Sequence, residues 1–175
     1  MKNIFSNNLK LRGQVGFTLI EVIVVMVIIG IAATFAIPGF NGFLDSSNVR
    51  TASNDFVSAC NLARSEAVTR VANVTVCKSA NQSTCTTSGD WAQGWIVFVD
   101  ANGDDDAADT GEMIIRVYDG AGGATTMAGS ANIANRLTYA GTGFFSADFS
   151  GTVTVTAGSR SMVIATSGTG RVRTQ

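Results

Sequence analysis

The stretch Gly16-Phe17-Thr18-Leu19-Ile20-Glu21, followed by an uncharged apolar run from Val22 to Phe40, organises the rest of this chain. At about 1.5 Å per residue, a helix over such a run is roughly 30 Å long, which matches the hydrocarbon thickness of a bilayer. The pattern predicts a membrane-spanning helix over residues 17–40. A carboxylate in such a helix costs about 2.5–3.5 kcal/mol on insertion scales, so Glu21 is expected to have a partner or to lie near the membrane surface.

Two simpler interpretations of this stretch leave some of its features unexplained. A conventional signal peptide has an apolar core of about 7–15 residues followed by a small-residue cleavage site. The run here is longer, and Thr34-Phe35-Ala36 is a poor match to such a site. A plain single-span anchor explains the length of the run, but it explains neither Glu21 nor the junction between Gly16 and Phe17.

Together with the basic leader and Pro38, these residues resemble the class III signal and N-terminal helix of type IV pilins and pseudopilins. The resemblance implies that residues 1–16 are a leader, that a prepilin peptidase cleaves between Gly16 and Phe17, and that Phe17 is then methylated. It also implies that Glu21 guides assembly by pairing with the terminal amine of a neighbouring pilin. Because Phe17 and Glu21 are four residues apart, a helix places them on one face.

Charge indicates where the chain lies. The sequence has 12 basic and 13 acidic residues, and loss of Lys2, Lys10 and Arg12 with the leader leaves a net charge of −4. Nucleic-acid binding would therefore require a local basic patch. Three cations before the apolar run favour a cytoplasmic N-terminus. We expect a single-pass inner-membrane protein with a periplasmic C-terminal domain that is incorporated into a pilus or pseudopilus.

The cysteines agree with an oxidising compartment. Cys77 and Cys85 flank a polar segment typical of a loop, and a disulfide between them would stabilise a periplasmic domain. A zinc site is the alternative, but two cysteines without any histidine make a poor ligand set. Cys60 is expected to be an unpaired, buried, small hydrophobic residue.

The remaining pattern predicts an α+β protein. Apolar residues at spacings of three and four predict an amphipathic helix over residues 41–72, with its apolar face formed by Ala52, Phe56, Ala59, Cys60, Ala63 and Ala67. Short β-rich runs fill residues 73–175, at 74–76, 95–99, 113–118, 133–139, 144–149, 152–156 and 161–165. We therefore expect a type IV pilin-like fold, with a long N-terminal helix packed on a mostly antiparallel β-sheet domain.

Sequence motifs after the N-terminal helix indicate a particular group within the pilin superfamily. Ala63-Arg64-Ser65-Glu66-Ala67, Val76-Cys77, Gly94-Trp95-Ile96-Val97-Phe98 and the ending Gly168-Thr169-Gly170-Arg171-Val172-Arg173 are similar to those of the GspH/FimT group of minor pilins and pseudopilins. With the N-terminal motif, the resemblance covers nearly the whole chain.

An acidic loop follows the run at 95–99. Asp100, Asn102 and Asp104 offer alternate oxygen ligands around a glycine, a feature of calcium loops, and some pilin relatives bind calcium. The spacing does not reproduce an EF-hand, and a hairpin rich in Asp, Asn and Gly needs no metal to explain it. We therefore expect neither a metal nor another cofactor, and keep calcium as the alternative.

The C-terminal end holds the second candidate site. Arg171 and Arg173 would project to one face of a strand, and two guanidiniums presented together suit phosphate oxygens. In FimT-type members of the resembled group, a Gly-Arg-x-Arg ending is associated with DNA uptake, and Gly170-Arg171-Val172-Arg173 matches it. The alternative is a solvated terminus that keeps the last strand soluble.

Catalysis has little support in the sequence. Histidine is absent, which excludes Ser-His-Asp and Cys-His arrangements, and there is no GxxxxGK phosphate loop. We expect a non-enzymatic minor pilin of a type IV pilus that primes or caps the filament and binds double-stranded DNA through its tail. The alternatives are a minor pseudopilin of the H type at the tip of a type II secretion system, and an anchored binding protein that does not assemble.

Overall fold

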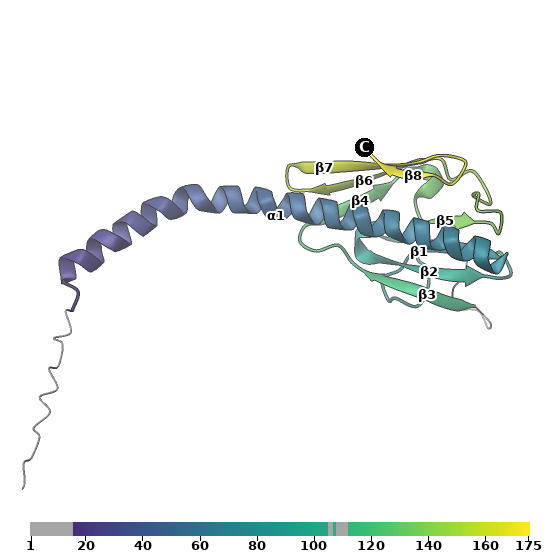
Figure 1. The fold of residues 1–175 in the computed structure, drawn as a ribbon, viewed down its shortest axis with the longest axis horizontal. Coiled ribbons are helices and arrows are strands. Elements are labelled where there is room, and N and C mark those ends of the chain that lie inside the picture. The colour runs from purple at the N-terminus through teal and green to yellow at the C-terminus, as the bar shows by residue number, and fades with distance from the viewer. Residues whose placement is uncertain (1–15, 105–106, 108–111) are drawn as a thin grey trace, which may run out of the picture. The chain divides into compact units, whose positions relative to one another are not determined.

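The computed structural model describes residues 16–104, 107 and 112–175, and for residues 35–39 it describes the backbone alone (Figure 1). The chain divides into two compact units, residues 1–39 and 40–175. Helix α1, Leu19–Arg70, has residues in both, and each unit is described here by itself.

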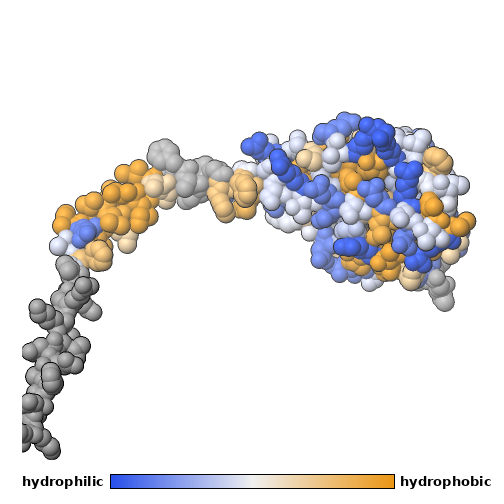
Figure 2. All heavy atoms as spheres, viewed as in Figure 1, coloured by the Kyte–Doolittle hydropathy of each residue, from blue (hydrophilic) through white to orange (hydrophobic). Residues whose placement is uncertain are grey.

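The described part of the first unit is an exposed apolar helix preceded by a short extended segment. Thr18 caps this helix, because its side-chain Oγ1 accepts a hydrogen bond from the backbone N–H of Glu21 at 3.3 Å. The large apolar side chains from Leu19 to Ile31 are about half exposed or more, and Figure 2 shows them as a run of hydrophobic surface.

Within the described residues, no helix reaches the length and hydropathy that a membrane span requires. The span expected over residues 17–40 includes residues 35–39, whose side chains lie outside the described part of the chain. Membrane insertion therefore stays a prediction.

In the second unit, α1 buries one face. The six residues predicted for that face, from Ala52 to Ala67, are all at most 4% exposed, so the predicted amphipathic pattern is confirmed. The helix ends where Val71 takes a positive φ of 52° and the N–H of Ala72 bonds to the carbonyl of Ala67 at 3.3 Å. This is the Schellman geometry, here with valine in the position that glycine usually fills.

Eight strands form two antiparallel sheets. The first sheet has the order β3-β2-β1-β5, and the second has the order β4-β6-β7-β8. The strands are β1 Asn73–Lys78, β2 Gly94–Asp100, β3 Met113–Asp119, β4 Thr125–Gly129, β5 Arg136–Tyr139, β6 Gly151–Ala157, β7 Arg160–Thr166 and β8 Val172–Thr174. Two short 3₁₀ helices, η1 Trp91–Gln93 and η2 Ala131–Ile133, precede β2 and β5.

Both sheets and the second part of α1 enclose the main hydrophobic core, and a smaller cluster is formed by Cys77, Ile96, Phe98 and Ala107. Phe56 of α1 contacts the rings of Trp91 and Trp95 edge-on, with centroids 4.9 Å and 5.7 Å apart. The indole N–H of Trp91 donates to the carbonyl of Ile133 at 3.0 Å, which connects the segment before β2 to η2. The core residues of β6 and β7, including Val153 and Ile164, are completely buried.

The α+β class and the helix packed on antiparallel strands are confirmed. The strands divide into two sheets where a single sheet was expected, and β4 was missed because Thr125–Gly129 has little apolar character. The strand expected over 144–149 was wrong: only Phe145 makes a bridge, to Tyr139, and the chain then turns so that Ser146 N–H bonds to Thr138.

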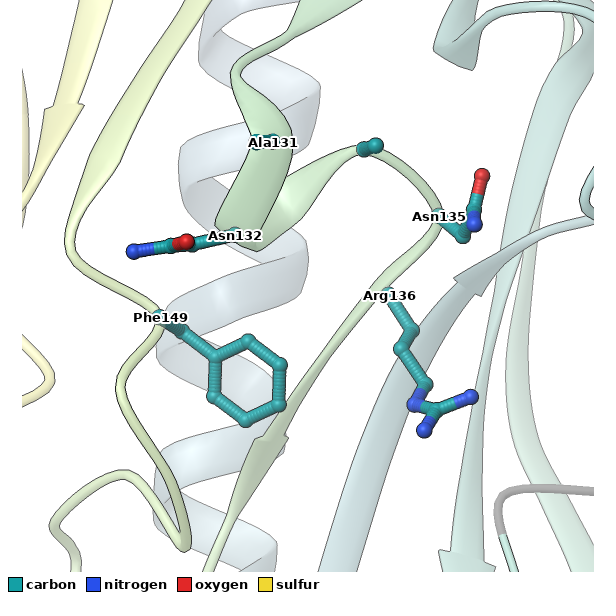
Figure 3. Close-up of a pocket in the computed structure, with 6 residues that line it drawn as sticks. Ala131, Asn132, Asn135, Arg136 and Phe149 are labelled. Atoms are coloured by element: carbon teal, nitrogen blue, oxygen red, sulfur yellow. The ribbon is translucent and has the colours of Figure 1, made fainter.

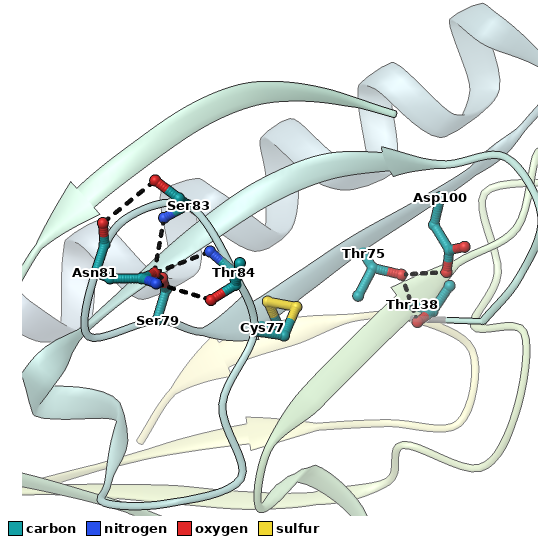
Figure 4. The surroundings of a disulfide bond; sticks show 9 residues. Thr75, Cys77, Ser79, Asn81, Ser83, Thr84, Asp100 and Thr138 are labelled. Atoms are coloured by element: carbon teal, nitrogen blue, oxygen red, sulfur yellow. Dashed lines mark hydrogen bonds between the residues drawn. A yellow bond between two sulfur atoms is a disulfide. The ribbon is translucent and has the colours of Figure 1, made fainter. Parts of the chain in front are cut away.

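The cysteine predictions are confirmed. Cys77 and Cys85 form a disulfide, and Cys60 is free and buried. Figure 4 shows the polar loop that the disulfide closes, in which Asn81 Oδ1 accepts hydrogen bonds from the backbone of Ser83 and Thr84. Burial raises the pKa of the Cys60 thiol far above its ordinary value, which keeps that thiol neutral.

Candidate functional site

The expected processing site lies at the start of the described chain. Gly16 and Phe17 precede α1, both are exposed, and the Phe17 side chain is 82% exposed. Glu21 lies in the first turn of the helix, and Phe17 and Glu21 both line a shallow groove with Val22, Val25 and other apolar residues. The first unit thus presents one carboxylate in an exposed apolar face, an arrangement suited to helix–helix packing with a paired charge.

The acidic loop brings carboxylates together. One carboxylate oxygen each from Asp100, Asp104 and Glu112 lies within 4.8 Å of the others. Both oxygens of the buried Asp100 already accept hydrogen bonds, from the Thr75 hydroxyl at 3.0 Å and from the Gly103 N–H at 2.8 Å. The Thr75 hydroxyl in turn bonds to that of Thr138, and Figure 4 shows these three side chains pointing toward one another.

Asn102 takes part in the turn of this loop. Its Oδ1 accepts from the Asp104 N–H at 3.0 Å, and its Nδ2 donates to Asp104 Oδ2 at 2.9 Å. The first of these bonds is that of an Asx turn, which accounts for the fold of the loop without requiring a metal. Calcium binding by Asp100, Asn102 and Asp104 stays the alternative, and residues 105–106 and 108–111 lie outside the described part of the loop.

The arginine ending is held in place by a buried tyrosine. Gly170 has φ +81°, and a Cβ there would lie 2.9 Å from Tyr139 Cε1 and 3.3 Å from the Gly143 carbonyl oxygen, so this position requires glycine. The Tyr139 hydroxyl donates to the Gly170 carbonyl at 3.0 Å. Burial raises the pKa of Tyr139 well above its usual value, so the hydroxyl keeps the proton it donates.

A tight turn from Ser167 to Arg171 also holds the arginine ending in place. The Gly170 N–H bonds to the Ser167 carbonyl, and the Ser167 N–H bonds to the Arg171 carbonyl, both at 2.9 Å. Strand β8 then pairs with β7, with Arg173 opposite Ala165. The structure therefore places Arg173 on an edge strand and Arg171 immediately before it, where the start of the strand is fixed by the core.

Both arginine side chains are available to a ligand. Arg171 and Arg173 are exposed, and their guanidiniums make no ion pair or hydrogen bond with any other residue in the described part of the chain. They border a shallow pocket of about 330 Å³ with residues of β7 and the last residues of the chain.

Charge is distributed unevenly along the sequence. Residues 120–175 contain four arginines and one acidic residue, Asp148, whereas residues 17–119 contain five basic and twelve acidic residues. The Asp148 carboxylate accepts hydrogen bonds from the hydroxyl and the backbone N–H of Ser150, and these bonds lower its pKa. The part of the chain that holds Arg171 and Arg173 thus carries a local net charge of +3, although the mature chain is acidic overall.

A further pocket, of about 230 Å³, lies beside η2. Its lining includes Asn132, Asn135, Arg136 and Phe149. Figure 3 shows that the polar ends of Asn132, Asn135 and Arg136 point in different directions and do not meet at a common point. This pocket therefore does not present a converging set of ligand groups.

The sequence reasoning missed two contributors to these sites. Tyr139 is 31 positions from Gly170, and no local pattern connects them. Thr18 could have been found, because Thr18-x-x-Glu21 before an apolar run is the signature of a helix N-terminal capping box.

Comparisons with known proteins agree with this architecture. The family model for type II transport protein GspH matches residues 52–170, and the model for the prokaryotic N-terminal methylation motif matches residues 11–37. Type II secretion system core protein G of Vibrio cholerae serotype O1 is 45% identical over 49 residues, which are 28% of this chain and 34% of that protein. The chain thus spans about a third of the length of that curated relative.

Two crystal structures of the type IV minor pilin FimU of Pseudomonas aeruginosa strain PAO1 have a similar fold. The form in space group P21 has a TM-score of 0.59 at 18% identity, covering 76% of this chain and 92% of the solved one. The form in space group P65 has a TM-score of 0.55 at 19% identity, covering 72% and 91%. Since the GspH model matches most of the chain and the methylation motif precedes it, the resemblance seen in the sequence is confirmed: the chain belongs to the GspH family of pilin-like proteins.

Proposed function

We propose that this chain is a minor pilin of a type IV pilus, which helps to prime or cap the filament and binds duplex DNA through Arg171 and Arg173. The DNA-binding part rests on two exposed arginines, Arg173 on edge strand β8 and Arg171 just before it, at an ending held by Tyr139 and Gly170. Among the described residues, neither guanidinium has an intramolecular partner. Adjacent guanidiniums match phosphate oxygens in charge and hydrogen-bond geometry.

The assembly part rests on the N-terminal residues. A prepilin peptidase would cleave between the exposed Gly16 and Phe17, and Phe17 would be methylated. Residues 17–40 would then lie in the inner membrane and later among the helices of other pilins, with Glu21 paired to a neighbour's terminal amine. Residues 41–72 and the domain of residues 73–175 would lie in the periplasm. No catalytic activity is proposed.

Assembly is tested by processing and incorporation. In cells, mature protein should begin at Phe17, and Glu21→Gln should reduce incorporation into sheared filaments while leaving the amount of membrane-associated protein unchanged. Asp55→Asn, at an exposed carboxylate of the second part of α1, is the matched control for charge removal. Mature chains that still carry residues 1–16, or equal incorporation of the Glu21 variant, would contradict the proposal.

DNA binding is tested with the intact chain in nonionic detergent and a labelled duplex of arbitrary sequence, over a range of salt concentrations. Each phosphate contact contributes a slope of about −0.9 to log K against log salt, so Arg171→Ala and Arg173→Ala should each reduce the slope by about one unit. Arg116→Ala, on β3 of the first sheet, should leave it unchanged. Unchanged binding by the double tail variant would refute the DNA-binding part.

A second function, that of a minor pseudopilin at the tip of a type II secretion system, is favoured by the description of the matching family and by the curated relative. Deletion of the gene separates the two functions. Loss of DNA uptake or of surface pili supports the pilus, whereas loss of a secreted protein from the medium supports the secretion system.

A further inference from the structure

The second sheet presents an outer face of hydroxyl side chains together with Ala128, Val163 and Ala165. On β4, β6 and β7, the residues Met127, Val153, Val155 and Ile164 point inward and are completely buried. Because side chains alternate along a strand, the residues between them point outward. The hydroxyl residues of this face are Thr126, Thr152, Thr154, Thr156 and Ser161, here called the hydroxyl face.

The pairing register connects the hydroxyl face to the arginine ending. Arg173 lies opposite Ala165 on β7, and Ala165 lies opposite Thr152 on β6. Directly paired residues of antiparallel strands project to the same face of a sheet. Arg173 therefore stands at one side of the hydroxyl face, and Arg171 directly precedes β8 in the sequence.

The composition of these strands suits a polyanion. None of the four strands of the second sheet contains Asp or Glu, so no strand residue of this face carries a charge that repels phosphate. The Asp45 carboxylate lies at one end of the sheet, beside Gly158 in the turn between β6 and β7. Threonine and serine hydroxyls are common partners of phosphate oxygens in DNA complexes, where they position the backbone without reading sequence. The hydroxyls of this face would donate neutral hydrogen bonds, next to the cationic hydrogen bonds of Arg171 and Arg173.

We propose that the hydroxyl face continues the arginine site and binds the phosphate backbone of duplex DNA. This inference rests on the proposed function and extends it from two side chains to a surface. Strands are about 4.7–4.9 Å apart, so the distance from β8 to β4 is about 14 Å. A duplex lying across the strands presents one phosphate per strand about every 3.4 Å of axis, which places about four phosphates of one backbone over this width.

The same face argues against single-stranded DNA. Proteins that bind single strands stack bases on aromatic side chains, and the outward positions of these four strands hold no aromatic residue. An exposed aromatic side chain, Phe144, belongs instead to the loop whose backbone lies against Gly170. Binding at the hydroxyl face should therefore favour duplex and show little sequence preference.

Removal of the hydroxyls tests the face without changing its charge. The variant Thr152→Val/Thr154→Val/Thr156→Val keeps β-branched side chains that suit a strand. Loss of three neutral hydrogen bonds to phosphate should lower duplex affinity about tenfold. The salt slope stays the same because no cation is removed, whereas Arg171→Ala/Arg173→Ala lowers the slope. The unfolding midpoint, followed by tryptophan fluorescence, checks that the intact chain in detergent remains folded.

A charge series provides an independent measurement. Thr154→Lys should steepen the salt slope by about 0.9, and Thr154→Glu should weaken binding at low salt. Val117 is the matched control, since it is exposed at 38% on β3 of the first sheet. Equal effects of the same substitutions at both positions would show a response to net charge alone and would overturn the inference.

The outcomes separate the inference from the function on which it rests. Loss of binding in the arginine variant with unchanged affinity in the triple threonine variant would leave the arginine site in place and refute the hydroxyl face. Unchanged binding in the arginine variant would refute the DNA-binding part of the proposed function. Tighter binding of a single strand of equal length, abolished by Phe144→Ala, would move the site to the neighbouring loop and also overturn the inference.

Discussion

Replacement of Gly170 by alanine should destabilise the domain and loosen the arginine ending. A non-glycine residue at a left-handed φ such as the +81° observed here costs about 1–2 kcal/mol. The new Cβ would also lie 2.9 Å from Tyr139 Cε1, so that either the turn or the buried ring must move. That movement strains the hydrogen bond from the Tyr139 hydroxyl to the Gly170 carbonyl, worth about 0.5–1.5 kcal/mol.

We therefore expect Gly170→Ala to lower the free energy of unfolding by about 2–3 kcal/mol, the combined size of these two effects. With a urea dependence of about 1–3 kcal/mol per molar for a small domain, the midpoint should fall by at least about 0.7 M. Trp91 and Trp95 are both buried in the core, so their fluorescence reports the unfolding of this domain in the intact chain.

The same turn offers a matched control. Gly168 has no atom within 4 Å of the position that a Cβ would take, and its φ lies outside the left-handed region. Gly168→Ala should therefore change the free energy of unfolding by no more than about 0.5 kcal/mol in either direction. The reasoning is refuted if the two alanine variants unfold at the same urea concentration.

Four other outcomes are expected. Cys77 and Cys85 are 8 residues apart in sequence. Reduction of their disulfide should lower the free energy of unfolding, measured by urea titration, by about 2–3 kcal/mol. The double variant Cys77→Ser/Cys85→Ser should have the same stability as the reduced protein. Tyr139→Phe should cost about 0.5–1.5 kcal/mol, measured by urea unfolding, and should leave the effect of Gly168→Ala unchanged. Burial raises the pKa of the Cys60 thiol in the folded state above its unfolded value of about 9. The stability that the neutral, buried thiol contributes is therefore complete below about pH 9 and falls by about 1.4 kcal/mol per pH unit as the pH rises further. Cys60→Ala should give a shallower decline of the free energy of unfolding at alkaline pH. Addition of EDTA should leave the thermal midpoint unchanged, because both oxygens of Asp100 already accept hydrogen bonds, and a rise of several degrees with millimolar calcium would establish the alternative.

Local patterns predicted much of the fold. The spacing of Ala52, Phe56 and Ala63 indicated the buried face of α1, since one helical face is read directly from residues three and four apart. The β-rich runs that became β2 and β3 were recognised because their side chains suit strands on their own. Thr125–Gly129 carries no such signal, and it forms a strand through pairing with β6.

The sequence predicted which residues form the candidate sites, but not how those residues are arranged in space. The motif around Gly16, Phe17 and Glu21 was visible because it is contiguous, as were the two arginines of the ending. The support that holds those arginines was not visible, because Tyr139 reaches Gly170 across 31 positions of sequence. An interaction at such a separation depends on how the two sheets pack, which no short pattern encodes.

The amino-acid order alone specified the N-terminal motif, the amphipathic helix, the disulfide-closed loop and the residues of the arginine ending, because each depends on neighbours within one or two turns or a short loop. Tertiary structure decided the rest. It divided the strands into two sheets, set Arg173 opposite Ala165 and beside the threonines of β6, and gave Gly170 its contact with Tyr139. The physical reason is register: a shift of one residue between paired strands turns every side chain to the other face, and only packing of the whole core selects which face is buried.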